Sequence, residues 1–206
     1  MGLYAKHIFP RLMDWAMSGE EFQRLRSELV SLASGTVLEI GLGTGLNLPY
    51  YSRQVTWLHA VEPAILLPKR LAQRGKNALC PIDITRISAE MLPFDDRTFD
   101  YAVSTWTLCT IPDPVRALQE VRRVLKPSGQ FLFLEHGRSE DEKIAKWQDR
   151  LDPIQNLIGC GCHLNRRIDQ LVRQAGFSTT KLDRFVMQTV PRLGGAMYRG
   201  QAFRGD

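Results

Sequence analysis

The amino-acid sequence predicts an α/β fold, a doubly wound, mostly parallel sheet of seven strands that ends in an antiparallel hairpin, with extra helices at the N-terminus. Short apolar runs alternate along the chain with longer amphipathic stretches, as in parallel sheets covered by helices on both faces. A glycine-rich turn directly follows the first apolar run, as it does in many such sheets. With 206 residues the chain is long enough for one domain with its own core. We expect residues 35–206 to form this core and residues 1–34 to form a helical lid.

Two helices are expected ahead of the sheet. Residues 4–17 carry apolar side chains about one helical turn apart: Tyr4, Ile8, Leu12 and Trp15. Pro10 should kink or break this helix, because proline lacks the N–H that a helix interior needs. The second helix, residues 20–33, should end before Gly35, a suitable C-terminal cap.

The expected strands are short apolar or β-branched runs: residues 36–40, 57–61, 82–87, 99–104, 130–135, 178–185 and 195–203. The helices between them should cover residues 64–74, 114–125, 141–158 and 166–175. Residues 126–129 read Lys-Pro-Ser-Gly and predict a turn, since Pro and Gly end helices. Asp152 before Pro153 should end or kink its helix.

Composition and charge exclude several classes of protein. The chain is 44% hydrophobic and 24% charged, which excludes a disordered or fibrous chain. The net charge of +5 is dispersed over the sequence and does not interleave with aromatic residues, so no nucleic-acid partner is expected. No signal peptide and no apolar run of about 20 residues is visible. We expect a cytoplasmic monomer, and peripheral membrane contact stays open.

The four cysteines are Cys80, Cys109, Cys160 and Cys162, too few and too uneven for a disulfide framework. Reduced thiols are therefore expected. Cys162 and His163 stand together in a Cys-Gly-Cys-His run, but no second pair of donors in the sequence would complete a tetrahedral zinc site. We expect no metal.

The most informative motif surrounds the glycines Gly41, Gly43 and Gly45, at the end of the first strand. Glycines there allow a ligand to approach the backbone where any Cβ would collide. An acidic residue about 20 positions on should end the second strand and accept two ribose hydroxyls. Glu62 follows Gly41 by 21 positions and ends an apolar run.

The motif departs from a dinucleotide site in two ways. Its glycines are spaced G-x-G-x-G instead of G-x-G-x-x-G, and Leu46 occupies the sixth position. Glu39 would sit poorly beside a pyrophosphate but suits an ammonium group. S-adenosylmethionine carries an ammonium and no phosphate, so the sequence predicts it as the cofactor.

Together these features resemble class I S-adenosylmethionine-dependent methyltransferases. The stretch from Glu39 to Gly45 resembles their first motif, Ser88 to Asp100 resembles their adenine-side loop and fourth strand, and Val121 to Gly129 resembles the helix and turn before their fifth strand. The resemblance covers residues 36–136 and implies a Rossmann-like fold. Many relatives carry aspartate where Ser88 stands, so either the Ser88 hydroxyl or the Ala89 backbone would bind the adenine amino group.

A narrower likeness extends nearly to the C-terminus. Residues 104–112, 133–136, 147–153 and 161–166 resemble a branch that includes membrane-associated thiol S-methyltransferases and phospholipid methyltransferases. This resemblance implies a small-molecule methyl acceptor, and we expect a thiol. Two alternatives stay open: N-methylation of the phosphatidylethanolamine headgroup, and a catalytically silent protein that binds S-adenosylmethionine.

Motif positions and resemblance together give the expected cofactor-binding residues: Glu39, Gly41, Gly43, Gly45, Asn47, Glu62, Pro63, Ser88, Ala89, Glu90, Thr105 and Trp106. The Thr105 carbonyl should meet the ammonium group of the methionine tail. Trp106 should shield the sulfonium through a cation–π contact, with a core aromatic as the alternative.

The expected catalytic residues are His136, His163 and Arg166. His136 follows the fifth strand at the edge of the sheet where ligands bind; the alternative is a loop histidine bonded to backbone. His163 and Arg166 would cap the pocket, unless Asn165 caps the following helix and they pack around it. The N-terminal helix should either close the pocket with Tyr4 and His7 or, through Lys6 and Arg11, meet anionic headgroups.

Overall fold

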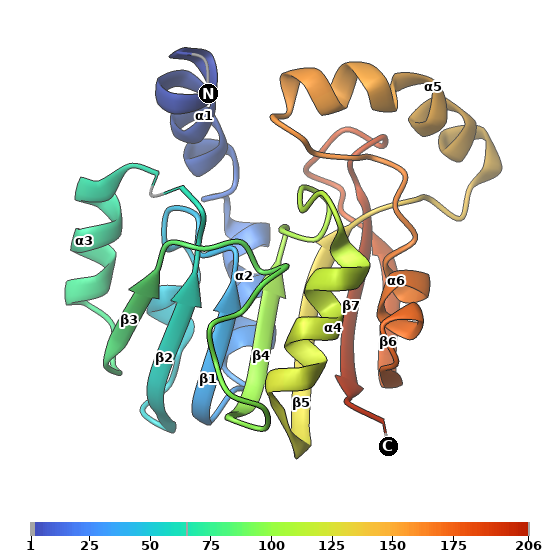
Figure 1. Cartoon of the computed structure of the whole chain (residues 1–206). Coiled ribbons are helices and arrows are strands. Elements are labelled where there is room, and N and C mark those ends of the chain that lie inside the picture. The colour runs from blue at the N-terminus through green and yellow to red at the C-terminus, as the bar shows by residue number, and fades with distance from the viewer. Residues whose placement is uncertain (1–2, 65, 206) are drawn as a thin grey trace.

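The computed structural model describes residues 3–64 and 66–205, and its centre is a seven-stranded sheet (Figure 1). The strands are β1 (Gly35–Ile40), β2 (Val55–Val61), β3 (Ile82–Thr85), β4 (Phe99–Thr105), β5 (Leu125–His136), β6 (Ser178–Val186) and β7 (Ala196–Phe203). Their order is β3-β2-β1-β4-β5-β7-β6. The first five strands run parallel, and β7 is antiparallel to both of its neighbours. The predicted doubly wound sheet with a C-terminal antiparallel pair is confirmed.

Two separate apolar layers cover the sheet. On one face β-strand side chains such as Leu38 pack with α4 (Pro114–Val124) and α6 (Ile168–Gln174). On the other face Val37 and its neighbours pack with α2 (Glu20–Val30) and α3 (Pro68–Lys76). Successive strand residues point to opposite faces, so one strand contributes to both layers.

The N-terminal segment divides into parts with different roles. A single π-helical turn, η1 (Tyr4–Ile8), leads directly into α1 (Phe9–Ala16), and Pro10 lies in the first turn of α1, where its missing N–H costs nothing. The expected break at Pro10 is therefore absent. Instead of belonging to a lid, α2 packs against the sheet through Leu25 and Leu29.

Several other elements also differ from those expected. α3 begins at Pro68, after Leu67 in a left-handed conformation, whereas the sequence suggested residue 64. β3 ends at Thr85. Residues 126–129 form a bulge within β5, since Leu125 pairs with Phe99 and the next paired residue is Gln130. The predicted turn is thus absorbed into the strand.

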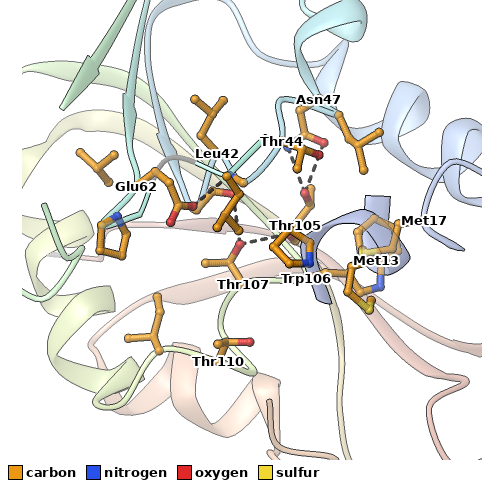
Figure 2. Close-up of a pocket in the computed structure, with 18 of the residues that line it drawn as sticks. Met13, Met17, Leu42, Thr44, Asn47, Glu62, Thr105, Trp106, Thr107 and Thr110 are labelled. Carbon is orange, nitrogen blue, oxygen red and sulfur yellow. Dashed lines mark hydrogen bonds between the residues drawn. The ribbon is translucent and has the colours of Figure 1, made fainter. Parts of the chain in front are cut away.

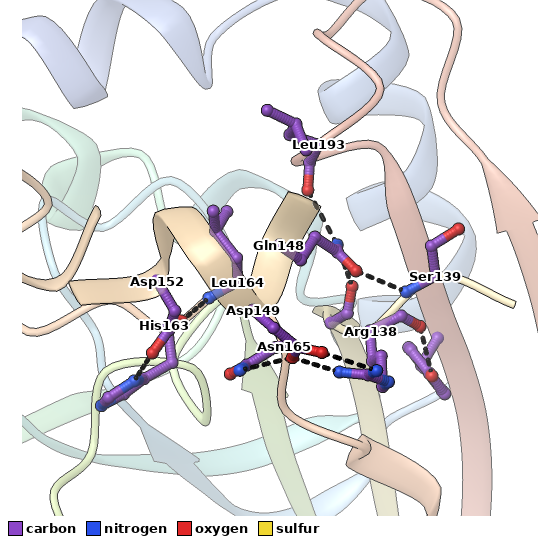
Figure 3. Close-up of polar contacts among 11 residues, drawn as sticks. Arg138, Ser139, Gln148, Asp149, Asp152, His163, Leu164, Asn165 and Leu193 are labelled. Atoms are coloured by element: carbon purple, nitrogen blue, oxygen red, sulfur yellow. Dashed lines mark hydrogen bonds and ion pairs between the residues drawn. The ribbon is translucent and has the colours of Figure 1, made fainter. Parts of the chain in front are cut away.

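α5 (Glu142–Ile158) lies above the carboxyl ends of the parallel strands, as does α1 (Figure 1). Pro153 lies inside α5, which continues to Ile158, so the helix does not end at Asp152. Polar contacts attach α5 to the core (Figure 3): the buried amide of Gln148 donates to the carbonyls of Gly137 and Leu193 at 3.0 and 2.8 Å. Its oxygen accepts from the Ser139 N–H at 2.8 Å.

A short η2 turn (Leu48–Tyr50) completes the set of helical segments in the described residues. None of the helices in residues 3–64 and 66–205 is long and apolar enough to cross a membrane. α6 begins at Ile168 with Arg167 as its N-cap, so Asn165 does not cap it; Asn165 donates instead to Asp149 at 3.0 Å.

Gly200 in β7 gives a test of how tightly the sheet and its core fit. A Cβ at this position would lie 2.2 Å from Cζ of Phe133, a fully buried ring. We expect Gly200→Ala to cost about 1–3 kcal/mol, as overpacking in cores does. That lowers Tm by roughly 2–12 °C in thermal unfolding.

Gly75→Ala is the matched control, because a Cβ at Gly75 has no neighbour within 4 Å and the residue lies inside α3. It should be neutral or stabilise the chain by roughly 0.5–1 kcal/mol through helix propensity. Equal Tm changes in the two variants would contradict the packing shown here.

Candidate active site

A cavity of about 320 Å³ opens at the carboxyl ends of β1, β2 and β4 (Figure 2). Its wall is formed by the loops that follow the first four strands, by α1 and by Arg26 of α2. Nine residues expected to bind the cofactor line it: Gly41, Gly43, Asn47, Glu62, Pro63, Ser88, Ala89, Thr105 and Trp106. The expected residues Glu39, Gly45 and Glu90 lie outside this lining. The cavity therefore lies where crossover topology places ligands in open α/β sheets.

At Gly43, in the turn after β1, no side chain covers the backbone on the side that faces the cavity. Gly43 has a φ of +56°, and a Cβ there would meet no protein atom within 4 Å, so the adjacent space belongs to the cavity. Gly41 has a φ of +75°, and a Cβ there would lie 2.2 Å from Oγ1 of Thr107. Glycine at these positions allows the turn to bend and the loop after β4 to approach it.

Glu62 joins the end of β2 to this turn. Its Oε2 accepts the Gly43 N–H at 2.9 Å, and its Oε1 accepts the Ala64 N–H at 3.2 Å. Burial raises the pKa of Glu62, and the two backbone hydrogen bonds oppose that rise. Each carboxylate oxygen keeps a lone pair, so Glu62 can still accept two hydroxyl groups from a ligand in the cavity.

Glu39 lies behind the cavity wall and is only 1% exposed. Its two oxygens accept from Asn47 Nδ2 at 3.0 Å and from the Tyr51 hydroxyl at 2.8 Å. Asn47 and Thr105, which bond to each other at 2.9 Å, line the cavity in its place. A ligand ammonium in the cavity would meet Asn47 and Thr105 before Glu39. The sequence predicted that Glu39 binds the ammonium directly, and the position of Glu39 behind the cavity wall does not favour that contact.

Arg26 is a lining residue that the sequence did not reveal. Its guanidinium is buried, donates to the Met17 carbonyl at 2.7 Å and lies 4.7 Å from the centroid of the Trp106 ring. Its Nε has no hydrogen-bond partner within the described part of the chain. Burial lowers the pKa of Arg26 to about 10, so the side chain stays charged and suits a ligand carboxylate. The cation over Trp106 is thus Arg26.

α1 forms one wall of the cavity through Phe9, Met13 and Met17 (Figure 2). The buried carboxylate of Asp14 anchors this helix: it forms ion pairs with Arg70 and, at 2.6 Å, with Arg74, and it accepts a hydrogen bond from Thr44. Burial would raise the pKa of Asp14, but these hydrogen bonds outweigh burial and hold it below its usual range.

Tyr4 and His7, expected to face the pocket, are exposed instead. The Tyr4 hydroxyl donates to the Ile158 carbonyl of α5 at 3.0 Å. The first turns of the segment therefore reach α5, and the apolar face of α1 reaches the cavity.

The three expected catalytic residues do not line the cavity. Nδ1 of His163 bonds to Asp152 at 2.8 Å, and its Nε2 lies 3.0 Å from Asn156 (Figure 3 shows the Asp152 contact). Arg166 donates to the carbonyls of Leu108 and, at 2.6 Å, Ile111, so it supports the loop after β4 from behind.

His136 and its neighbour Glu135 contact different groups at the end of β5. Glu135 accepts from the Ser104 hydroxyl at 2.6 Å and from the Thr107 and Leu108 N–H groups at 2.9 and 3.1 Å. Consecutive strand residues face opposite sides, so His136 does not share the contacts of Glu135. Its Nε2 lies 3.1 Å from Sγ of Cys162, near Cys109 of the loop after β4. The sequence placed His136 at the right edge of the sheet but could not give its direction.

The structure brings more possible metal-binding side chains together than the sequence around Cys162 suggested. Cys109 and His136, which are distant from Cys162 in the sequence, lie close to it in the fold.

The burial of Glu39 predicts a pH dependence of stability. Burial raises its pKa to about 7, although hydrogen bonds from Tyr51 and Asn47 and the charge of Arg26 lower it. Glu39 keeps its proton to a higher pH in the folded state than in the unfolded state. The free energy of unfolding of the protein therefore falls as pH rises from about 4.5 to about 7. The loss is of the order of 3 kcal/mol at about 1.4 kcal/mol per pH unit.

We therefore expect Glu39→Gln to gain stability relative to the native chain when pH rises from 5 to 8. Urea unfolding at both values measures this gain. Glu28→Gln is the control, because Glu28 is largely exposed and forms only surface ion pairs. A stability difference between Glu39→Gln and the native chain that does not change with pH would contradict a neutral, buried Glu39.

Three comparisons with known proteins agree with this geometry. The model of a family described as a methyltransferase domain matches residues 38–133. The thiol S-methyltransferase TMT1B of Rattus norvegicus is 31% identical over 196 residues, covering 86% of this chain and 78% of the relative. The phosphatidylethanolamine N-methyltransferase of Cereibacter sphaeroides is 28% identical over 141 residues, covering 68% and 70%. A solved methyltransferase of Thermotoga maritima, titled a possible histamine N-methyltransferase, superposes with a TM-score of 0.69 at 22% identity, covering 96% and 99%.

S-adenosylmethionine, the cofactor of this fold family, fits the residues that line the cavity. Glu62 can accept the ribose hydroxyls, and the bare backbone at Gly43 leaves room for the sugar. Ser88 Oγ donates to Glu90 at 2.6 Å and so stays available only as an acceptor, as an adenine amino group requires. Asn47, Thr105 and Arg26 also line the cavity and would be available to the ammonium and carboxylate of the methionine tail.

We expect Glu62→Gln to weaken binding of S-adenosylhomocysteine by about 10- to 100-fold, because the change removes the charge that strengthens the hydrogen bonds from the ribose. Isothermal titration measures this loss. Asp83→Asn, an exposed change on β3 outside the cavity lining, should bind as the native chain does. Unchanged affinity in Glu62→Gln would remove Glu62 from the ribose site.

The bare glycine turn, the acid at the end of β2 and the polar pair Asn47 and Thr105 form one site at the edge of the sheet. Its geometry suits an adenosyl group and an amino-acid tail. The methyltransferase that is 31% identical to this chain is matched over 78% of its own length. The protein is thus an S-adenosylmethionine-dependent methyltransferase with a Rossmann-like sheet. The chain belongs to the methyltransferase family that includes the thiol S-methyltransferases TMT1B.

Proposed function

We propose that this enzyme transfers the methyl group of S-adenosylmethionine to a small, apolar thiol. The observation that carries the proposal is the character of the cavity at the end away from Glu62. Figure 2 shows Glu62 on one side and Met13 and Met17 on the other. The lining there includes the thioethers of Met13 and Met17, and the cavity as a whole has further apolar or weakly polar lining from Phe9, Thr110 and Ile111.

No histidine or lysine lines the cavity within the described residues. Its ionisable lining groups are Asp14, Arg26 and Glu62. Asp14 is held in ion pairs with two arginines, and Glu62 is engaged by backbone N–H groups. The enzyme therefore supplies position and an apolar environment to the acceptor, and no free general base.

This arrangement favours a nucleophile that ionises by itself. The bound cofactor supplies an activated methyl group on a positively charged sulfur, and the acceptor must stand behind that methyl. A thiol with a pKa near 8.5 provides a useful fraction of thiolate at neutral pH, and an amine with a pKa near 10.4 provides far less neutral base. Thioether and aromatic side chains also suit a polarizable sulfur.

A second acceptor is favoured by a different observation. Large apolar side chains are exposed on η1, α1 and α5, above the carboxyl ends of the strands: Leu3, Ile8, Leu12, Trp15, Trp147, Ile154, Leu157 and Ile158. Trp15 is 75% and Leu157 79% exposed. Such a surface near the cavity is consistent with contact to lipid. It supports the phosphatidylethanolamine headgroup as the alternative acceptor.

One assay separates the candidates. Transfer of labelled methyl from S-adenosylmethionine is measured to a panel of alkyl and aryl thiols, soluble amines, and vesicles that contain phosphatidylethanolamine. We expect label in the apolar thiols, recovered in the organic phase, and none in the amines or the lipid. Label in the lipid alone would replace the thiol by the headgroup. Tight binding of S-adenosylhomocysteine without any labelled acceptor would favour a silent binding protein.

A pair of variants on α1 sharpens the assay. Met13→Ala should lower kcat/KM for a large apolar thiol by about tenfold, because it removes apolar contact worth roughly 1–2 kcal/mol. Leu12→Ala is the matched control, since Leu12 is on the same helix and half exposed. Neither change should alter affinity for S-adenosylhomocysteine. A larger effect from Leu12 than from Met13 would count against an acceptor at this wall.

A further inference from the structure

Three side chains with soft donor atoms meet behind the loop after β4. Cys109 comes from that loop, His136 from the end of β5, and Cys162 from the segment between α5 and α6. One donor atom of each lies within 4.8 Å of the other two. His136 Nε2 and Cys162 Sγ are 3.1 Å apart. The three elements are far apart in sequence, so only the fold assembles this cluster.

The cluster is enclosed and lies outside the cofactor cavity. Cys109 and His136 are buried, and Cys162 is half-buried. The backbone around the cluster is fixed, because the His163 N–H donates to the Cys109 carbonyl at 2.9 Å. None of the three donors lines the cavity. Nδ1 of His136 is buried without a hydrogen-bond partner within the described part of the chain, so few protein groups compete for this ring.

We propose that Cys109, His136 and Cys162 bind one soft divalent cation of the Zn²⁺ type. Two sulfurs and one imidazole nitrogen are a ligand set that zinc takes in proteins. Tetrahedral coordination with these bond lengths separates two sulfurs by about 3.8 Å and a sulfur from a nitrogen by about 3.6 Å. The observed 3.1 Å between His136 and Cys162 and the 4.8 Å limit of the cluster bracket these values. Side-chain adjustments of less than about 1 Å therefore suffice.

The charges balance in such a site. Each of the two thiols releases its proton to solvent as its sulfur binds, and the two thiolates neutralise the dication. The histidine binds through a neutral nitrogen. The fourth position falls to water, which the half-buried side of Cys162 admits.

A bound ion would link the loop after β4 to β5 and to the segment before α6. That loop supplies Trp106, Thr107 and Ile111 to the cavity. Arg166 and Glu135 already hold its backbone from two sides. The ion would act as a third fixed point, so we assign it a structural role that does not depend on the identity of the methyl acceptor.

Cobalt titration of the full chain tests the site. The protein is reduced, freed of metal with a chelator, and titrated with Co²⁺, whose spectrum reports its ligands. We expect one equivalent to bind with a thiolate-to-cobalt charge-transfer band and the d–d bands of tetrahedral coordination, and one equivalent of Zn²⁺ to displace it. Cys109→Ser and Cys162→Ser should each weaken Co²⁺ binding by at least about a hundredfold, since the ligands share the binding free energy.

Cys160→Ser is the matched control, because Cys160 lies two positions from Cys162 but outside the cluster. It should keep the native spectrum and stoichiometry. If a serine variant fails to fold by circular dichroism, His136→Asn tests the same site. A native chain without the charge-transfer band, or a band that survives both cysteine changes, overturns the proposal. So does a Cys109–Cys162 disulfide in protein isolated from zinc-supplemented cells, since it leaves no thiolate.

Discussion

The hydrogen bond from the Gly43 N–H to the Glu62 carboxylate is the contact on which the site depends. It links the turn after β1 to the end of β2, two strands that are neighbours in the sheet. Gly43 has a positive φ and places no side chain in the cavity beside this bond. The same carboxylate faces the cavity with lone pairs remaining, so it can accept hydroxyl groups of a sugar. The residues that shape the turn after β1 are thus the same residues that are available to bind a ligand.

Two buried carboxyl groups outside the cavity lining support this arrangement. Glu39 orders Asn47 and Tyr51 behind the turn after β1, and Glu135 binds two successive N–H groups of the loop after β4. Burial raises the pKa of each to about 7. Buried acids are costly unless their hydrogen bonds are satisfied, so the loops they bind are held in one conformation. The lining can therefore be largely apolar and still keep its shape.

The sequence predicted the parts of this molecule that depend on neighbours along the chain. The glycine turn, the position of Glu62 and the succession of strands and helices along the chain follow from local bends and hydrophobic periodicity, and the structure has them. Arg26 and Asp14 were not found, because each looks like an ordinary charged residue on an amphipathic helix. Asp14 meets Arg70 and Arg74 only after the chain folds. His136 was placed at the correct edge, but it lies beside Cys162 and outside the cavity lining, because one step along a strand reverses a side chain.

The anchoring of α1 by Asp14 has a consequence for traffic into and out of the cavity. Swinging this helix aside would leave a carboxylate without its two arginines, and an isolated charge of this kind is strongly unfavourable unless water replaces them at once. Partial opening is therefore the least favourable state. α1 should therefore have two states, one docked with its ion pairs formed and one displaced with Asp14 and the arginines hydrated. Small molecules would then exchange in discrete opening events. The rate of opening should depend on ionic strength, because Arg70 is partly exposed.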